Sequence, residues 1–155
     1  REKGVPVRIV RLFNVIGPRQ TGEYGMVAPR FVRQALVGEP LTVHGTGRQT
    51  RSFADVDDVA GALIKIMRHS KSAGKIYNLG SDEEISINNL AKKILKLTGS
   101  SSKVLYVPHD KVYSNGFEDM QRRRPDISKV KELINYNPKH SLDSTLKRII
   151  AHESA

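Results

Sequence analysis

Apolar residues along the chain recur at two spacings, and the pattern changes repeatedly from one spacing to the other. Residues 5–13 read VPVRIVRLF and are apolar at 5, 7, 9, 10, 12 and 13. This density predicts a strand largely buried on both faces, as in a parallel sheet. Further strands are predicted at 41–44, 75–80 and 104–107, which read LTVH, KIYNLG and VLYV.

Between these strands, apolar residues three and four positions apart predict helices. One helix is predicted at 27–37, ending at Gly38. The side chains predicted to cap four later helices are Asp57, Ser86, Asp126 and Ser141. Gly99 is predicted to close the helix that follows Ser86, and the residues predicted to face inward on the helix after Asp57 are Val59, Leu63, Ile66 and Met67. Strands that alternate with helices over short connections favour an α/β fold.

The longest segment without periodicity runs from Pro108 to Pro125. Compact domains rarely keep such a long irregular loop unless the loop has a function. We therefore expect this segment to act as a lid or a ligand clamp.

Composition supports a single compact body, because 155 residues with 38% hydrophobic content can bury a sizeable core. The sequence contains neither a run of 18 apolar residues nor a basic-then-apolar leader before the first strand, so we expect no membrane span and a cytoplasmic location. The absence of cysteine removes disulfides and thiolate metal sites from consideration, and the five histidines show no metal-binding spacing.

The charge balance, 26 Lys and Arg against 16 Asp and Glu, gives a formal net charge of +10 that favours ligands with phosphate groups. Such ligands include nucleic acids and nucleotides. A nucleic-acid reader is expected to interleave aromatic residues with its basic ones, but the aromatic content is 6% and the densest basic run, 122–124, adjoins a proline. The sequence therefore argues against a nucleic-acid partner.

Several polar residues stand where a phosphate-bearing ligand could bind. Asn14 ends a predicted buried strand, the usual position of ligand contacts in open α/β sheets, although an Asx turn is an equal alternative. Gly45 and Gly47 let the backbone approach a ligand closely, and Arg48 and Arg51 stand on either side of a turn, so both could reach one anion. By spacing alone, a hairpin turn with two solvated arginines is the commoner arrangement.

A helix start and a basic run offer two more anion sites. Met26 and Val27 begin a predicted helix whose first amides and dipole attract anions, and Arg30 could assist. A plain helix start facing water is an equal alternative. Arg122, Arg123 and Arg124 either surround a diphosphate or form a solvated loop, which is the commoner arrangement for a charge run.

Three segments, RLFNVIGPRQ at 11–20, LTVHGTGRQTRSFADVDD at 41–58 and QRRRPDISK at 121–129, resemble the NAD-dependent epimerase/dehydratase family. These proteins are extended short-chain dehydrogenases that act on nucleotide sugars. The resemblance covers almost all of residues 4–150 and implies the C-terminal portion of a Rossmann-type enzyme with its small α/β sugar-nucleotide domain. Residues 1–25 would be the last strand and loop of an otherwise missing Rossmann domain, and residues 26–155 would be the nucleotide-sugar-binding domain.

The resemblance also implies roles for particular residues. Asn14 would approach the sugar and diphosphate, and Phe13 would lie near the nicotinamide. The turn at Met26 and Val27 would place backbone amides against the phosphates. The residues that would border the base or bind the diphosphate and ribose are Leu41, Thr42 and Val43 for the base, Arg51 and Arg123 for phosphate, and Asp126 for ribose. In decarboxylating members the residue matching Arg123 meets the sugar carboxylate.

Two signatures of the family's chemistry are missing from these 155 residues: a glycine-rich dinucleotide turn and a Tyr followed four positions later by Lys. The resemblance therefore implies that a missing N-terminal half holds NAD (or NADP) and the catalytic pair. This portion alone is expected to be inactive and to bind no cofactor. The strand at 5–13 would lose its sheet neighbours, so we also expect the chain to associate.

The first functional hypothesis is the substrate-binding portion of a UDP-sugar 4-epimerase, with a UDP-sugar as ligand and a homodimer as the complete form. A UDP-glucuronate decarboxylase or an NDP-sugar 4,6-dehydratase is the alternative within the family. A non-catalytic nucleotide-sugar module or a nucleic-acid binder is the alternative from another class. No membrane partner and no metal are expected.

Overall fold

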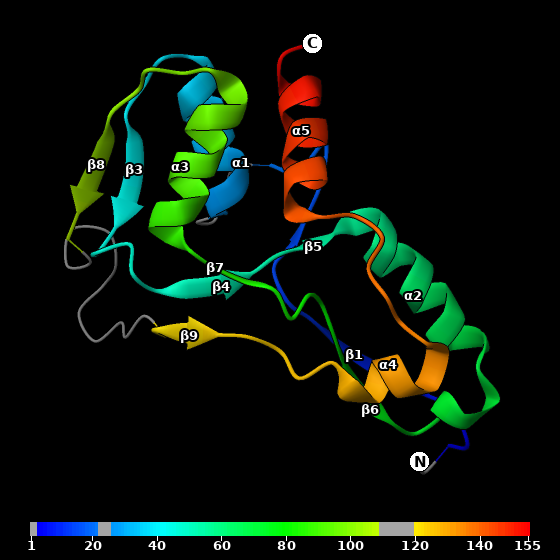
Figure 1. Ribbon diagram of the computed structural model, residues 1–155. Helices are drawn as coiled ribbons and strands as arrows, with labels where there is room; N and C mark the ends of the chain where they lie inside the picture. The colour runs from blue at the N-terminus through cyan, green and yellow to red at the C-terminus, as the bar shows by residue number, and fades with distance from the viewer. Residues whose placement is uncertain (1–2, 22–25, 109–119) are drawn as a thin grey trace.

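The computed structural model describes residues 3–21, 26–108 and 120–155 (Figure 1). The side chains of these residues form two hydrophobic clusters. Strands and helices alternate along the chain, and most strand pairs are parallel. The α/β class predicted from the sequence is confirmed.

The first cluster lies among three helices, α1 (Val27–Leu36), α3 (Ile87–Thr98) and α5 (Leu142–Glu153). Beside them β3 (Leu41–His44) pairs in parallel with β8 (Val104–Val107). The side chains that fill this cluster include Phe31, Val32, Leu41, Leu90, Ile94 and Leu146, all 0% exposed. Burial of this apolar surface is the main force holding the three helices together.

The second cluster lies over β1 (Ile9–Leu12) and β6 (Ile76–Leu79), a parallel pair. Two helices pack on it, α2 (Val56–Arg68) and α4 (Ser128–Ile134). Its buried side chains include Val59, Ile66, Tyr77, Leu79 and Val130. A short 3-10 helix, η1 (Ser70–Ser72), leads from α2 toward β6.

Short strands run between the two groups of helices in Figure 1. β2 (Val15–Ile16) pairs in parallel with β5 (Ala54–Asp55). β4 (Thr50–Ser52) is the central strand of a separate sheet. Its neighbours are the antiparallel β7 (Glu84–Ser86) and the parallel β9 (Arg122–Arg123).

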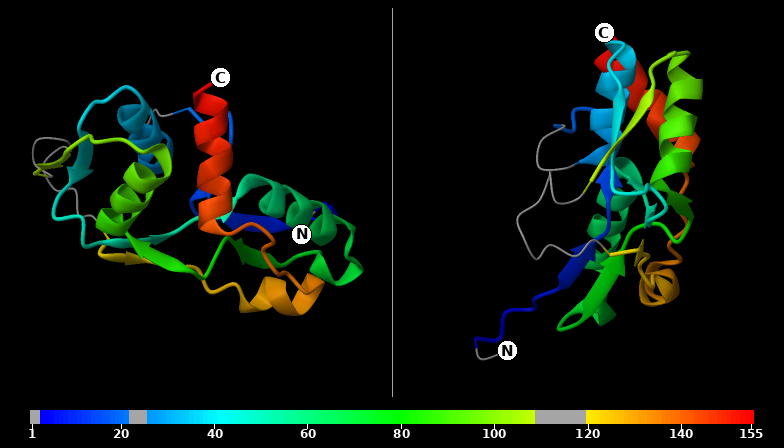
Figure 2. Two further views of the ribbon diagram at one scale, coloured as in Figure 1. Left: turned by 45° about the horizontal axis from the view of Figure 1, so that its top comes forward. Right: turned by 90° about the vertical axis from the view of Figure 1, so that its left-hand side faces the viewer.

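The predicted strand at 5–13 is wrong in its extent and its burial. Only Ile9–Leu12 forms a strand in this segment, with Ile9 49% and Leu12 47% exposed. Among the described residues β1 pairs only with β6, so its other edge has no strand partner within them. The right-hand view of Figure 2 shows the residues before β1 extending away from the rest of the chain.

Most predicted helix ends are confirmed. Gly38 follows α1 at φ +75°, and Gly99 closes α3 in the left-handed conformation that glycine adopts without strain. The Ser86 hydroxyl accepts a hydrogen bond from the Asn89 amide, and the Ser141 hydroxyl accepts one from the Ser144 amide.

The predicted start of α2 is wrong by two residues. Asp55, and not Asp57, caps the helix, because the Asp55 carboxylate accepts the Asp57 amide at 2.9 Å. Met67 is 61% exposed, so it does not face inward as predicted. The Asp126 carboxylate accepts the Ser128 amide at 2.9 Å, but the N-cap residue of α4 is Ile127.

The lid predicted at 108–125 falls largely on residues 109–119, outside the described part of the chain. Within the described part, Arg122–Arg123 form a strand where a loop was expected. The domain boundary at residue 25 stays a prediction, and β1 pairs across it with β6. No helix of the described residues is long and apolar enough to cross a membrane.

Candidate functional site

A cleft of about 530 Å³ opens where β1 and β2 end and α1 begins. This edge of parallel strands is where ligands bind in open α/β sheets. The polar side chains that line the cleft are Asn14, Gln20, Arg30, His44, Gln49, Arg51 and Arg123. Several apolar residues complete its wall, among them Val27, Phe53 and Ile87. Such a mixed lining, with a few polar groups on an apolar wall, is typical of small-molecule sites.

Arg51 and Arg123 come from neighbouring strands, since they are register partners in the parallel β4–β9 pair. Both side chains line the cleft. The Arg51 guanidinium donates hydrogen bonds to the carbonyls of Thr50 (2.8 Å) and Met120 (2.7 Å). The Arg123 guanidinium carbon lies 5.7 Å from the centroid of the Phe13 ring. Two guanidinium groups on one wall make a strong site for an anion with several oxygens.

Arg122 is directed away from the cleft, because successive side chains of a strand point to opposite faces. Its Nη2 lies 2.6 Å from the Glu84 carboxylate, which also accepts the Thr50 hydroxyl at 2.9 Å. These hydrogen bonds lower the pKa of Glu84 to about 2. Within the described part of the chain, no carboxylate is within salt-bridge distance of Arg123. The strand therefore directs Arg122 to a structural ion pair and Arg123 to the cleft.

The N-terminus of α1 forms a second wall of the cleft, with Met26, Val27 and Ala28 among the lining residues. Among the described residues, which exclude 22–25, no side chain caps this helix, and no acidic residue lies in its first turn. Its first amides and its dipole therefore add positive potential on the same cleft as the two arginines. Arg30 helps to fix the helix, because its Nη2 donates to the Thr42 carbonyl at 3.0 Å.

Asn14 lies in the turn between β1 and β2, with a backbone φ of +40°. Its amide nitrogen donates to the Ser52 carbonyl at 2.8 Å, so the side chain ties this turn to β4. No described residue donates a hydrogen bond to its amide oxygen. That oxygen is available to accept a hydrogen bond from a ligand.

Other predicted site residues lie outside the cleft lining. Leu41 and Val43 are 0% exposed in the first cluster, and the Thr42 amide donates to Gln34 Oε1 at 3.1 Å. Contact of Leu41 and Val43 with a base would therefore have to come from their backbone, whereas Thr42 is half-buried. Asp126 borders a separate opening, about 530 Å³, next to α4. The base and ribose roles of these residues stay predictions.

Sequence reasoning missed three polar residues of the cleft, Gln20, His44 and Gln49. Gln49 is 6% exposed, and its amide donates to the His44 carbonyl at 2.9 Å. The amide of Gln20 donates to the Val15 carbonyl at 3.1 Å. All three lie within the segments that carry the family resemblance, 11–20 and 41–58, but no individual role was expected of them.

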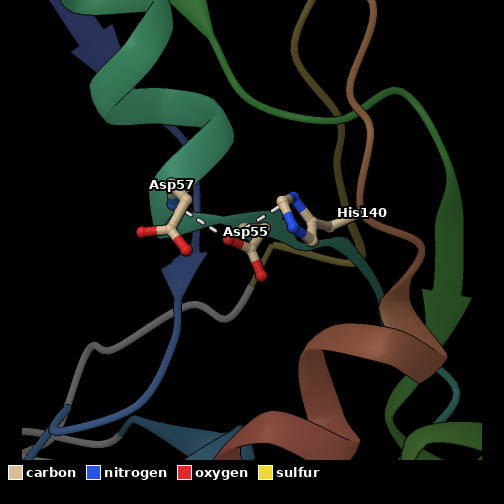
Figure 3. Close-up of side chains that lie close together, drawn as sticks. All are labelled: Asp55, Asp57 and His140. Atoms are coloured by element: carbon tan, nitrogen blue, oxygen red, sulfur yellow. Dashed lines mark hydrogen bonds and ion pairs between the residues drawn. The ribbon is translucent and has the colours of Figure 1, made fainter.

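A group of acidic side chains and a histidine lies apart from this cleft lining, at the start of α2 (Figure 3). Asp55, Asp57 and His140 offer ligand atoms within 4.8 Å of one another, a spacing that a metal ion could bridge. The Arg148 guanidinium, however, donates to both Asp55 oxygens at 3.0 and 3.1 Å and also to Asp57. Thr145 donates its hydroxyl to the buried Asp55 at 2.7 Å. We interpret the group as an ion-pair network that joins α2 to α5.

Comparison with known proteins identifies relatives of this chain. The sequence model of the NAD dependent epimerase/dehydratase family matches residues 1–80. UDP-N-acetyl-alpha-D-glucosaminuronate decarboxylase of Bacillus cytotoxicus is 47% identical over 149 residues, which cover 96% of this chain and 46% of that protein. UDP-glucuronic acid decarboxylase 1 of Xenopus tropicalis is 39% identical over 150 residues, 97% of this chain and 34% of that protein. The chain thus spans half or less of the length of these relatives.

Solved structures show the same fold. UDP-glucuronic acid 4-epimerase from Bacillus cereus, in complex with UDP-glucuronic acid and NAD, aligns with a TM-score of 0.85 and 28% identity. The alignment covers 97% of this chain and 46% of that one. UDP-glucose 4-epimerase of Thermotoga maritima, with UDP-glucose, aligns with a TM-score of 0.81 and 31% identity, over 94% of this chain and 45% of that one.

Proposed function

Since the chain belongs to the NAD-dependent epimerase/dehydratase family of extended short-chain dehydrogenases, we propose that it is the substrate-binding portion of an enzyme that decarboxylates a UDP-uronate. The observation that carries this proposal is the convergence of Arg51, Arg123 and the N-terminus of α1 on one cleft. A UDP-uronate carries a diphosphate and a carboxylate, so it matches a site with several positive groups.

We assign the two arginines different partners. Arg51 and the first amides of α1 hold the diphosphate, and Arg123 holds the sugar carboxylate. Asn14, through its amide oxygen, accepts a hydrogen bond from a sugar hydroxyl. These contacts bind and orient the substrate. The chain does no redox chemistry itself in this proposal.

The chain's own residues do not fit a complete NAD site, because no glycine-rich turn occurs in the sequence to admit a pyrophosphate. Phe13 is the residue expected to lie near the nicotinamide. The centroid of its ring lies 5.7 Å from the Arg123 guanidinium carbon. We therefore place NAD and the catalytic Tyr and Lys in a further part of the complete enzyme. The active form then includes both portions.

Decarboxylation stands ahead of epimerisation because the relatives at 47% and 39% identity are named as uronate decarboxylases. A UDP-uronate 4-epimerase is the second candidate, favoured by the structural match to the Bacillus cereus enzyme, TM-score 0.85. Both candidates take a UDP-uronate. Product analysis on the complete enzyme separates them, since only decarboxylation releases carbon dioxide.

The binding proposal is tested by calorimetric titration of the chain with UDP-glucuronate, UDP-N-acetylglucosaminuronate, UDP-glucose and NAD. We expect the uronates to bind about tenfold more tightly than UDP-glucose, the effect of one charge-assisted hydrogen-bond pair. We expect no binding of NAD. Equal affinities for UDP-glucose and UDP-glucuronate would refute the carboxylate contact, and absence of UDP-sugar binding by a folded chain would refute the site.

A further inference from the structure

A second cleft, of about 330 Å³, lies near the start of β6, at the opposite end of the β1–β6 pair from the cleft lined by Arg51 and Arg123, which we name the nucleotide-sugar cleft. It is formed where α2 ends, β6 begins and α4 passes beside both of them. The polar residues that line it are His69, Lys71, Lys75, Tyr77, Lys129 and Glu132. Leu133 adds an apolar contact. None of these residues belongs to the nucleotide-sugar cleft.

The second cleft has an excess of positive charge. Lys71, Lys75 and Lys129 face a single carboxylate in its lining, that of Glu132. Over the described ranges, none of these three lysines has a carboxylate within salt-bridge distance. The Lys129 ammonium donates to the Ile76 carbonyl at 3.2 Å and lies 5.9 Å from the centroid of the Tyr77 ring. Lys129 is thereby held at the cleft with its charge uncompensated.

Tyr77 brings a buried donor to the same cleft. The residue is 2% exposed, and its hydroxyl has no hydrogen-bond partner among the described residues. Buried tyrosine hydroxyls normally find a partner, because an unpaired one costs free energy. An acceptor that entered the cleft and reached this hydroxyl would remove the cost.

His69 adds a further donor. Its Nδ1 accepts a hydrogen bond from the Lys71 amide at 3.2 Å, so the proton of the neutral imidazole resides on Nε2. Three lysines, a histidine and a tyrosine therefore line this space beside the single Glu132 carboxylate, so donor groups outnumber acceptors in the lining. The ligand that such a set recognises is a multivalent anion with several acceptor oxygens.

We propose that the second cleft binds a phosphate group, as free inorganic phosphate or as the phosphomonoester of a small molecule. Its lining separates it from the nucleotide-sugar cleft, so the two sites can be occupied at the same time. The Tyr77 side chain lies in the second hydrophobic cluster between α2 and α4. Because His69 follows the C-terminal end of α2 and Lys129 lies on α4, a phosphate bound to both residues links these two helices.

The test is calorimetric titration with inorganic phosphate and, separately, with adenosine 5′-monophosphate at constant ionic strength. All samples carry Arg51→Ala and Arg123→Ala, so that anions bound at the first cleft do not contribute. The variants added to this background are Lys75→Gln with Lys129→Gln, Tyr77→Phe, and the control pair Lys92→Gln with Lys96→Gln on α3. Circular dichroism verifies that each variant is folded.

We expect saturable binding that weakens about tenfold in the Lys75→Gln/Lys129→Gln variant and about threefold in Tyr77→Phe, with no change in the control pair. Binding of phosphate alone identifies the free anion as the ligand, and binding of the nucleotide identifies a phosphomonoester. Either result supports the site. Absence of saturable binding, or an equal loss in the control pair, overturns it.

Discussion

Arg51 and Arg123 are register partners on adjacent parallel strands, although a long stretch of chain separates them. Parallel register partners project from the same face of their sheet, so both guanidinium groups reach the same cleft. Arg122, the neighbour of Arg123, projects from the other face and pairs with Glu84. This alternation provides a matched control within one strand.

We expect Arg51→Ala to weaken the binding of UDP, UDP-glucose and UDP-uronate alike, by about tenfold or more, because it removes a charge-assisted contact with the diphosphate. Arg123→Ala is expected to weaken the uronate alone. Arg122→Ala should leave all three affinities unchanged. Calorimetry measures each constant, and a uniform loss in Arg123→Ala would reassign that residue from the carboxylate to the phosphates.

Gly47 lies in the turn after β3 with φ +69°, and an added Cβ would stand 2.0 Å from Asn88 Oδ1 and 2.8 Å from Val43 Cγ1. We expect Gly47→Ala to cost about 2–4 kcal/mol, from left-handed strain and overpacking together. Gly38→Ala is the control, since Gly38 has φ +75° with open space around the added atom. It should cost only about 1 kcal/mol, the strain alone. Urea denaturation measures both values, and equal costs would show that crowding is negligible.

Thr145→Val tests the network at the start of α2. The substitution keeps the side-chain shape but removes the hydroxyl that donates to the buried Asp55 carboxylate at 2.7 Å. We expect a loss of about 1–3 kcal/mol in the free energy of unfolding, since the carboxylate loses a buried donor. Thr98→Val should cost less, because the Thr98 hydroxyl contacts only neutral backbone groups at the end of α3, the carbonyls of Ile94 and Leu95 and the Ser100 amide. Chemical denaturation that ranks the two variants in the reverse order would contradict the network.

The Glu84–Arg122 pair predicts a dependence of stability on pH. The folded pKa of Glu84 is about 2, below its ordinary value of 4.5, because the carboxylate accepts hydrogen bonds from Arg122 and Thr50. A depressed folded pKa stabilises the fold fully above the unfolded pKa. That contribution declines as the pH falls from about 4.5 and is gone below about 2.

The measurement is the melting temperature of the wild type and of Glu84→Gln from pH 6 to pH 3. We expect a constant difference down to about pH 5 and a shrinking one below it, as the unfolded carboxylate takes up its proton. A difference that does not change with pH would show that the pair contributes through packing and not through charge.

The exposed face of the β1–β6 pair that carries Ile9 and Ile76 predicts self-association. These two register partners are 49% and 40% exposed, and exposed apolar strands tend to pair between molecules. We expect Ile9→Gln with Ile76→Gln to shift the chain toward monomer in sedimentation velocity experiments. Ile64→Gln, at an exposed position of α2, serves as the control and should change nothing.

Local signals in the sequence predicted much of the fold. Ser86, Gly99 and Ser141 mark helix ends through their own backbone chemistry, so their positions could be predicted without knowledge of the tertiary structure. Asp55 and Asp57 both suit a helix cap, and the choice depends on the Arg148 and Thr145 contacts made by α5. No local pattern contains that information.

In the candidate site, too, some features follow from local sequence and others depend on tertiary contacts. The residue types of Arg51 and Arg123 drew attention in the sequence, but their pairing depends on the two-residue strand β9, which has no periodicity to detect. Leu41 and Val43 carried an expected ligand role that the burial of β3 restricts to their backbone. Burial depends on which helices cover a strand, and the spacing within that strand does not reveal it.

The position of the cleft lined by Arg51 and Arg123, between the two hydrophobic clusters, has a mechanical consequence. The α1 wall is anchored in the first cluster, whereas Val15, on the opposite wall, packs against the second. In the proposed binding mode, a nucleotide sugar held by the α1 amides on one wall and by Asn14, next to Val15, on the other acts as a tether that resists their separation, beside the short strands that already join them. Substrate binding would then stiffen the whole chain, and the two clusters would unfold as one cooperative unit when the ligand is bound.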